Sequence, residues 1–132
     1  MSEDYLKGKV ALVTGAGSDG FGRRMALAFA EKGADVVLND IDMEGLEESK
    51  RILQDTYDSE VLIVKADISD PKEVDKMEEM VFETFDNVFL LVNNAGIDGG
   101  LKASLKAKEE TFEKVMGVNV KGNLWLAKHM AP

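Results

Sequence analysis

The chain has 132 residues, 45% of them hydrophobic, which is enough apolar material for the core of one globular domain. Its formal net charge of −9 argues against nucleic acid or an anionic membrane surface as a partner. It contains no cysteine, so disulfides, cysteine-based zinc sites and a thiol nucleophile are excluded. The acidic N-terminus does not resemble a signal peptide, and no apolar run approaches membrane-spanning length, so we expect a cytoplasmic protein.

Apolar runs and helical periodicity alternate along the chain. Runs of β-branched and aliphatic residues predict four buried strands, at 10–13, 35–39, 61–64 and 88–92. Capping residues and apolar spacings of three and four predict four helices, from 24 to 32, after Asp42, after Ser69-Asp70-Pro71 and from about 108 to 130. Strands and helices in alternation predict a doubly wound α/β fold with a parallel sheet, whose ligands bind at the carboxyl ends of the strands.

The segment between the first strand and the first helix is dense in glycine. Gly15-x-Gly17-x-x-Gly20 fits the dinucleotide fingerprint, and a glycine turn before a helix N-terminus is suited to bind an anion. The same glycines also begin like a phosphate-loop NTPase motif, but Phe21-Gly22 stands where that motif needs Lys followed by Ser or Thr. A glycine-rich turn without a ligand is the third possibility. The glycine pattern alone does not distinguish these three interpretations, so the rest of the sequence is needed.

Two aspartates follow predicted strands at the edge where a ligand would bind. Asp40 ends the second strand, and an acid there suits hydrogen bonds from the ribose hydroxyls of adenosine. A carboxylate would also repel a 2′-phosphate, which predicts NAD in preference to NADP. Alternatively Asp40 caps the next helix, a role that Asp42 can fill equally well. Asp67 follows the third strand, and for it the helix-cap role is better suited to Ser69 or Asp70.

Four short motifs follow one another along the chain. They are Thr14-Gly15 with Gly20 and Gly22, Asp67-Ile68, Asn93-Asn94-Ala95-Gly96 and Asn119-Val120-Lys121-Gly122. In this order, from about Leu6 to Met130, they resemble the N-terminal half of a short-chain dehydrogenase/reductase. The resemblance implies a Rossmann-like domain and an oxidoreductase that transfers hydride between a nicotinamide cofactor and a carbonyl or alcohol substrate.

The resemblance also implies roles for individual residues. The glycine turn would cradle the pyrophosphate, the Asp67 position would contact the adenine, and the Asn94-Ala95-Gly96 backbone would lie along the cofactor. The implied cofactor-binding residues are Gly15, Gly17, Ser18, Gly20, Phe21, Gly22, Asp40, Ile41, Asp67, Ile68, Asn94, Ala95 and Gly96. No metal site is expected.

The glycine turn departs from the family in one respect. The family spaces its glycines as Thr-Gly-x-x-x-Gly-x-Gly, whereas four residues separate Gly15 from Gly20 in this chain. We interpret Asp19 as the extra residue. An acid so close to a pyrophosphate has to point away from it or weaken binding.

Asn119 lies in an otherwise apolar stripe, whose other members are Phe112, Val115, Gly122 and Leu126. A buried amide is costly unless it finds hydrogen-bond partners. The resemblance implies that Asn119 belongs to the catalytic tetrad and holds a water in its proton relay; the alternative is a satisfied core amide. Off this stripe, we interpret Leu124 and Trp125 as candidates for a subunit contact, and the lone His129 as compensating a helix dipole.

The residues that would complete the catalytic site are not in place. In the family a fifth strand supplies a serine and the following helix a Tyr-x-x-x-Lys pair, and the sequence stops at Pro132, where that strand should begin. We therefore expect 1–132 to be an incomplete dinucleotide-binding domain, truncated to about four strands and catalytically incomplete alone. Tyr5 and Lys9 match the pair's spacing, but Gly8 and the strand that follows predict an extended segment at the amino edge of the sheet, so we interpret the match as coincidental.

Two other interpretations stay open: a non-catalytic nucleotide-binding module, and an interaction protein that pairs through the edge of the fourth strand. Asp40, Asp67 and Asn119 favour the oxidoreductase, because a scaffold has no need of them. An open strand edge and an incompletely covered sheet predict a homo-oligomer. The expected partners are a dinucleotide and, only in a completed protein, a small carbonyl or alcohol substrate, with no nucleic acid and no membrane.

Overall fold

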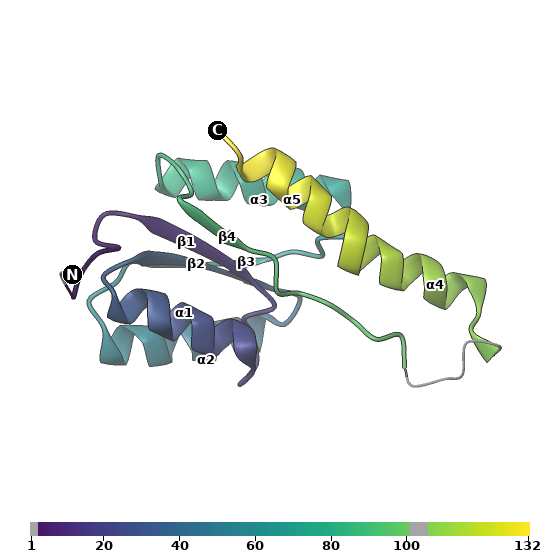
Figure 1. The fold of residues 1–132 in the computed structure, drawn as a ribbon, viewed down its shortest axis with the longest axis horizontal. Coiled ribbons are helices and arrows are strands. Elements are labelled where there is room, and N and C mark those ends of the chain that lie inside the picture. The colour runs from purple at the N-terminus through teal and green to yellow at the C-terminus, as the bar shows by residue number, and fades with distance from the viewer. Residues whose placement is uncertain (1–2, 101–105) are drawn as a thin grey trace.

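A computed structural model describes residues 3–100 and 106–132. Its strands are β1 (Val10–Thr14), β2 (Asp35–Asp40), β3 (Val61–Lys65) and β4 (Leu90–Val92). Its helices are α1 (Phe21–Glu31), α2 (Met43–Thr56), α3 (Pro71–Thr84), α4 (Glu109–Met116) and α5 (Asn123–Met130), with a π-helical segment, η2 (Gly117–Gly122), between the last two. The strands form one parallel sheet in the order β3-β2-β1-β4 (Figure 1), which confirms the predicted α/β fold.

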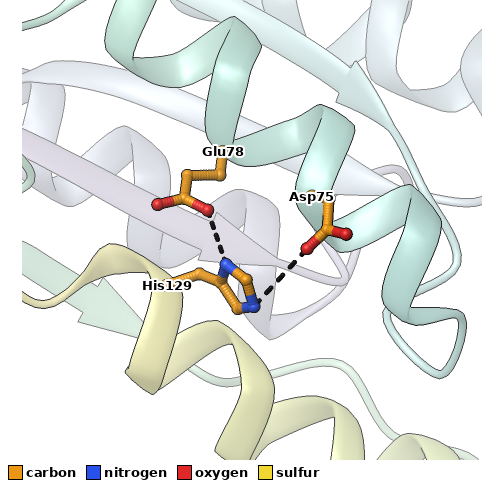
Figure 2. A group of neighbouring side chains, drawn as sticks. All are labelled: Asp75, Glu78 and His129. Atoms are coloured by element: carbon orange, nitrogen blue, oxygen red, sulfur yellow. Dashed lines mark hydrogen bonds and ion pairs between the residues drawn. The ribbon is translucent and has the colours of Figure 1, made fainter.

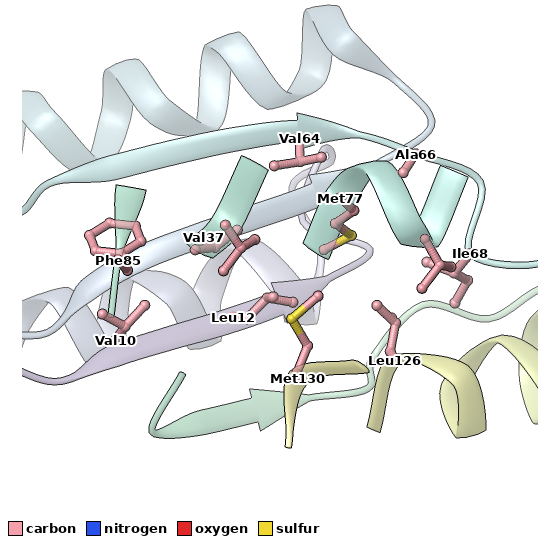
Figure 3. Close-up of a cluster of buried hydrophobic side chains, with 12 residues drawn as sticks. Val10, Leu12, Val37, Val64, Ala66, Ile68, Met77, Phe85, Leu126 and Met130 are labelled. Atoms are coloured by element: carbon pink, nitrogen blue, oxygen red, sulfur yellow. The ribbon is translucent and has the colours of Figure 1, made fainter. Parts of the chain in front are cut away.

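Helices cover both faces of the sheet, with α1 and α2 on one side and α3 and α5 on the other (Figure 1). Successive side chains of a strand point to opposite faces, so each strand contributes to both layers. Leu12 and Val37 pack with Met77 of α3 and Leu126 of α5 (Figure 3), and all four are fully buried. The opposite layer is built from Val13, Ala16, Ala26, Ala30, Val36, Leu38, Leu46, Leu53 and Val61. Burial on both faces explains why the strands read as continuous apolar runs.

The start of α3 confirms one predicted cap, whereas α2 begins differently. Asp70 is the N-cap of α3, accepts a hydrogen bond from Lys72 N at 2.9 Å, and is followed by Pro71 in the first turn. Asp42 occupies the N-cap position of α2, but its side chain makes no capping hydrogen bond. The first helix begins at Phe21 and not at Arg24, because the turn leads directly into helical backbone after Gly20.

Two predictions about the second half of the chain are wrong in detail. β4 begins at Leu90 and not at residue 88, because its partner strand β1 begins at Val10 and leaves the earlier residues only one ladder bond, from Phe89 N to Val10 O. The predicted helix over 108–130 is continuous, but η2 interrupts its α-helical hydrogen bonding. None of its described helical segments, nor any other described helix, is long and apolar enough to cross a membrane.

The sequence predicted an extended segment before β1, and this prediction is also wrong. Residues 3–8 form turns, with hydrogen bonds from Lys7 N to Asp4 O at 3.0 Å and from Lys9 N to Leu6 O at 2.9 Å, and Gly8 has φ of +75°. Leu6 is buried and anchors the segment at the end of α1 by donating from its N–H to Lys32 O. The Tyr5-x-x-x-Lys9 segment is therefore neither extended nor helical, and it lies at the amino edge of the sheet.

Candidate functional site

The glycine turn leaves the carboxyl end of β1 and packs against the chain that follows β4. Gly15 has φ of +66°, a conformation that side chains with a Cβ rarely adopt, and a Cβ there would lie 2.9 Å from Asn94 Nδ2. A Cβ on Gly22, in the first turn of α1, would collide with Gly15 O. These two glycines are therefore required because α1, the glycine turn and the loop that follows β4 approach one another closely.

The turn presents the start of α1 without a competing anion. Gly20 is the N-cap, no side chain caps the helix, and its first turn contains no acidic residue. Asp19 is turned outward: its side chain is 75% exposed and its carboxylate lies 3.7 Å from the Arg24 guanidinium. The first-turn N–H groups and the positive end of the helix dipole are thus available to an anion.

Asp40, at the end of β2, closes the other side of the turn. Its Oδ2 accepts a hydrogen bond from Gly17 N at 2.9 Å and its Oδ1 one from Asp42 N at 3.1 Å. A Cβ on Gly17 would lie 2.8 Å from Asp40 Cγ, so the carboxylate lies directly against the turn. The helix-cap alternative does not hold, because Asp42 is the residue at the N-cap position of α2.

Thr14 joins β1 to the loop after β4, and its role was missed in the sequence. Its Oγ1 accepts hydrogen bonds from Asn94 N at 3.0 Å and from Ala95 N at 2.9 Å. In return Asn94 Nδ2 donates to Thr14 O at 2.9 Å and to Gly15 O at 3.2 Å. The available sequence signal was a hydroxyl residue at the end of an apolar run, because Thr14 is fully buried there and a buried hydroxyl needs hydrogen-bond partners.

Asp67 follows β3 and is engaged locally. Its Oδ1 accepts from Ser69 N at 2.9 Å and from Ser69 Oγ at 2.6 Å, while its own N–H donates to Glu73 Oε2 at 2.6 Å. These contacts shape the turn into α3, which Asp70 caps. Helix capping is therefore not the role of Asp67.

A cavity of about 230 Å³ lies between the ends of the strands. Its lining includes seven of the predicted cofactor-binding residues, namely Gly15, Asp40, Ile41, Asp67, Ile68, Ala95 and Gly96. Gly17 and Ser18 line a separate hollow behind the turn, while Phe21 is 81% exposed at the start of α1. Lys114 and Val118 also line the cavity and were missed, because a cationic or aliphatic residue on a helix carries no local signal of a site.

Asn119 lies within η2 and binds both backbone polar groups of one residue, Ile97, in the loop that follows β4. Its Oδ1 accepts from Ile97 N and its Nδ2 donates to Ile97 O, both at 2.8 Å. Its backbone carbonyl accepts a hydrogen bond from Asn123 Nδ2 at 2.8 Å. Both ends of the amide are thus paired with the protein, which is the arrangement that the satisfied-amide alternative requires.

His129, in the last turn of α5, faces two carboxylates of α3 (Figure 2). Its Nδ1 lies 2.5 Å from Glu78 Oε2 and its Nε2 lies 3.6 Å from Asp75 Oδ1. Dipole compensation alone is therefore an incomplete explanation, since the ring also links the two helices. These three residues are the one group within the described parts of the chain with the donor atoms to hold a metal ion. The direct contact of His129 with Glu78 explains why these three side chains lie together, and no metal ion is needed for it.

The residues proposed for a subunit contact differ in exposure. Leu124 is 64% exposed, whereas Trp125 is half-buried and packs against the core layer under α3 and α5. Trp125 carries Lys128 Nζ 5.2 Å from its ring centroid. Of the two, only Leu124 presents an apolar surface to solvent.

A family model described as short chain dehydrogenase matches residues 9–132. The chain belongs to this family. An uncharacterized oxidoreductase of Thermotoga maritima is 39% identical to it over 94% of the chain and 47% of that protein's length. This short chain dehydrogenase sequence thus spans about half the length, or less, of the first curated relatives that it matches.

Solved structures of the family show the same fold. L-sorbose reductase from Gluconobacter frateurii, in complex with NADPH and L-sorbose, superposes with a TM-score of 0.90 at 32% identity, over 98% of this chain and 48% of the reductase. 3-Ketoacyl-(acyl-carrier-protein) reductase from Brucella melitensis, in complex with NADH, gives a TM-score of 0.87 at 42% identity, over 96% of this chain and 50% of that one. One neighbour holds NADPH and the other NADH, so the family resemblance does not select between the two cofactors.

Proposed function

We propose that residues 1–132 form the dinucleotide-binding portion of a short-chain dehydrogenase and bind NAD(H) in preference to NADP(H). The observation that carries the proposal is the placement of Asp40, whose carboxylate lies against the glycine turn and lines the cavity at the strand ends. Asp19 is turned outward, so the extra residue of the turn does not oppose an anion at α1. The residues present therefore fit a nicotinamide dinucleotide.

Each part of the site has a proposed task. The turn from Gly15 to Gly22, with Ser18 and Phe21, holds the pyrophosphate through backbone N–H groups and the start of α1. Asp40 accepts hydrogen bonds from the adenosine ribose, with Ile41 beside it, while Asp67 and Ile68 border the adenine. The Asn94-Ala95-Gly96 backbone runs along the remainder of the cofactor.

When bound, the nicotinamide ring supplies the hydride donor or acceptor, and this chain supplies binding and orientation. Asn119 holds the backbone N–H and C=O of Ile97 and so fixes the loop that follows β4 beside the cofactor. We assign Asn119 to the catalytic constellation through this positioning role. Reduction of a carbonyl, or oxidation of an alcohol, is proposed only for a protein completed by the family's serine, tyrosine and lysine.

Homo-oligomerisation in the cytoplasm is part of the same proposal. β4 stands at one edge of the sheet, and Leu124 and Phe112 present exposed apolar side chains on the long C-terminal helix. A dimer or larger species is expected by analytical ultracentrifugation at micromolar concentration. A monomer that also binds no dye for exposed apolar surface would contradict it.

Calorimetric titration of the chain with NADH and with NADPH tests the cofactor assignment. NADH is expected to bind more tightly, because the Asp40 carboxylate faces the position where a 2′-phosphate would lie. Tighter binding of NADPH would refute the preference, and binding of neither would refute the proposed function. In the same sample, NADH oxidation with a panel of ketones should show no turnover. Turnover that vanishes in Tyr5→Phe would contradict the expectation that the chain alone is catalytically incomplete.

A further inference from the structure

Arg23 is the only buried charged residue in the parts of the chain that the structure describes, with 6% exposure. It lies on α1, immediately after the glycine turn. Its Nε donates to Ser49 Oγ at 2.7 Å, and a terminal nitrogen lies 3.1 Å from Glu48 Oε2. A guanidinium is costly to bury unless its donors are satisfied, so its position needs an explanation beyond packing.

The other partners of this network are backbone carbonyls of the glycine turn. Arg23 also donates to Gly17 O at 3.4 Å and to Gly45 O at 3.5 Å. Ser49 Oγ, which accepts from Arg23, donates to Ala16 O at 2.6 Å. The first turn of α2 lies so close that a Cβ on Gly45 would collide with Gly17 O. Two consecutive carbonyls of the turn are therefore held on the side of α2.

Holding these carbonyls fixes the direction of the adjacent N–H groups. In a trans peptide the C=O and the following N–H point in opposite directions. Gly17 N–H, opposite the carbonyl of Ala16, accordingly reaches Asp40 Oδ2 on the far side at 2.9 Å. Ser18 N–H, opposite the carbonyl of Gly17, must likewise point away from Arg23. The network thus keeps the Ala16 and Gly17 carbonyl oxygens away from an anion in front of the turn, with Gly17 N–H held by Asp40 and Ser18 N–H directed away from Arg23.

We propose that Arg23, acting through Ser49 and the Gly17 carbonyl, is a positioning residue for the pyrophosphate of the dinucleotide. The inference rests on the proposed function, and it adds a cation that never touches the ligand. Arg51 provides the contrast, because it carries the same charge, has a side chain that is 65% exposed, and pairs with Asp55 of its own helix.

The test compares Arg23→Met and Ser49→Ala with Arg51→Met in the full chain. Calorimetry with NADH is expected to show about a tenfold loss of affinity in Arg23→Met, a smaller loss in Ser49→Ala, and no more than about a twofold change in Arg51→Met. Arg23→Lys, which keeps a donor, should recover part of the loss. Binding of ADP should weaken more than binding of adenosine, which has no pyrophosphate.

Amide hydrogen exchange without nucleotide gives an independent readout. Gly17 N–H should exchange faster in Arg23→Met and Ser49→Ala, because the turn loses its anchor, and its exchange should remain as in the wild type in Arg51→Met. If Arg23→Met does not unfold cooperatively, Ser49→Ala decides. Unchanged NADH affinity and Gly17 exchange in the variants, or equal losses for ADP and adenosine, would overturn the inference alone. If the wild-type chain binds no NADH, the proposed function, on which the Arg23 inference rests, is refuted instead.

Discussion

The part of the chain up to β4 and the long C-terminal helix are built in different ways. The helices α1, α2 and α3 each bury several residues against the sheet, whereas α4 buries none. Four large apolar residues on the C-terminal helix, at intervals of four, are between 40% and 64% exposed: Phe112, Met116, Val120 and Leu124. The first part is a packed α/β core, and the second is attached to it through α5 and a few polar contacts.

This difference separates the residues that contribute most to the free energy of folding from those that present apolar surface to another molecule. A fully buried side chain contributes to the free energy of folding in proportion to the apolar area that it removes from water. An exposed apolar stripe contributes little to folding, and contiguous stripes of this kind mark interaction surfaces. Stability and assembly should therefore respond to substitutions in different halves of the molecule.

Leu12→Ala and Leu124→Ala break the comparison most directly, because the same atoms are removed from a side chain that is 0% exposed and from one that is 64% exposed. We expect Leu12→Ala to lower the free energy of unfolding by about 2–5 kcal/mol and Leu124→Ala by no more than about 0.5 kcal/mol. Urea unfolding measures both. Equal losses would mean that Leu124, and with it the exposed side of the C-terminal helix, is part of the core.

Asp40→Ala examines the ligand-binding side of the packed half. Loss of a charged hydrogen-bond acceptor should weaken NADH binding by about 1.5–3 kcal/mol and narrow the preference over NADPH. Asp86→Ala removes the same charge from an exposed position before β4 and serves as the control. If calorimetry gives equal NADH affinities for the two variants, Asp40 does not contact the ribose.

Asn119→Ala breaks the polar link between the two regions. Ile97 would lose partners for both its N–H and its C=O, which should cost about 1–3 kcal/mol and speed amide exchange at Ile97. Asn87→Ala, at an exposed site before β4, is the matched control. Protection of the Ile97 amide that survives in Asn119→Ala would show that the loop is held by other contacts.

His129→Gln should have the smallest effect. The contacts with Glu78 and Asp75 are partly solvent-exposed, with side-chain exposures of 38% and 61% for the two acids. Pairs of this kind contribute about 0–1 kcal/mol. A double-mutant cycle with Glu78→Gln measures the coupling in urea unfolding, and a value well above 1 kcal/mol would show that His129 is a principal anchor of α5.

The sequence predicted most of the packed half because its information is local. Buried strands such as Val10 to Val13 read as apolar runs, and Asp70 followed by Pro71 is a complete helix-start signal. The glycine turn and Asp40 were proposed as a nucleotide site from local signals too, the glycine spacing and the end of a predicted strand, and four short motifs in order indicated a family. The family they indicated is the one to which the chain belongs.

The features that the sequence did not predict depend on distant residues. Arg23 on an amphipathic helix looks like a surface charge, and its burial follows from Ser49, 26 positions away. The partner of His129 lies 51 positions earlier, on another helix. η2 has no compositional signature, because Gly117–Gly122 differs from an α-helix only in its hydrogen-bond spacing. Such features require the topology before they can be inferred.

The hydrogen bonds between Thr14 and Asn94 have a consequence for how the chain folds. They join residues 80 positions apart, and two other strands and three helices lie between β1 and β4 in the chain. Closing so long a loop costs chain entropy and slows folding, so the docking of β4 should be a late event. The mouth of the cavity is then absent from partly folded molecules. A ligand that needs it would bind the finished fold alone and, by mass action, draw the folding equilibrium toward it.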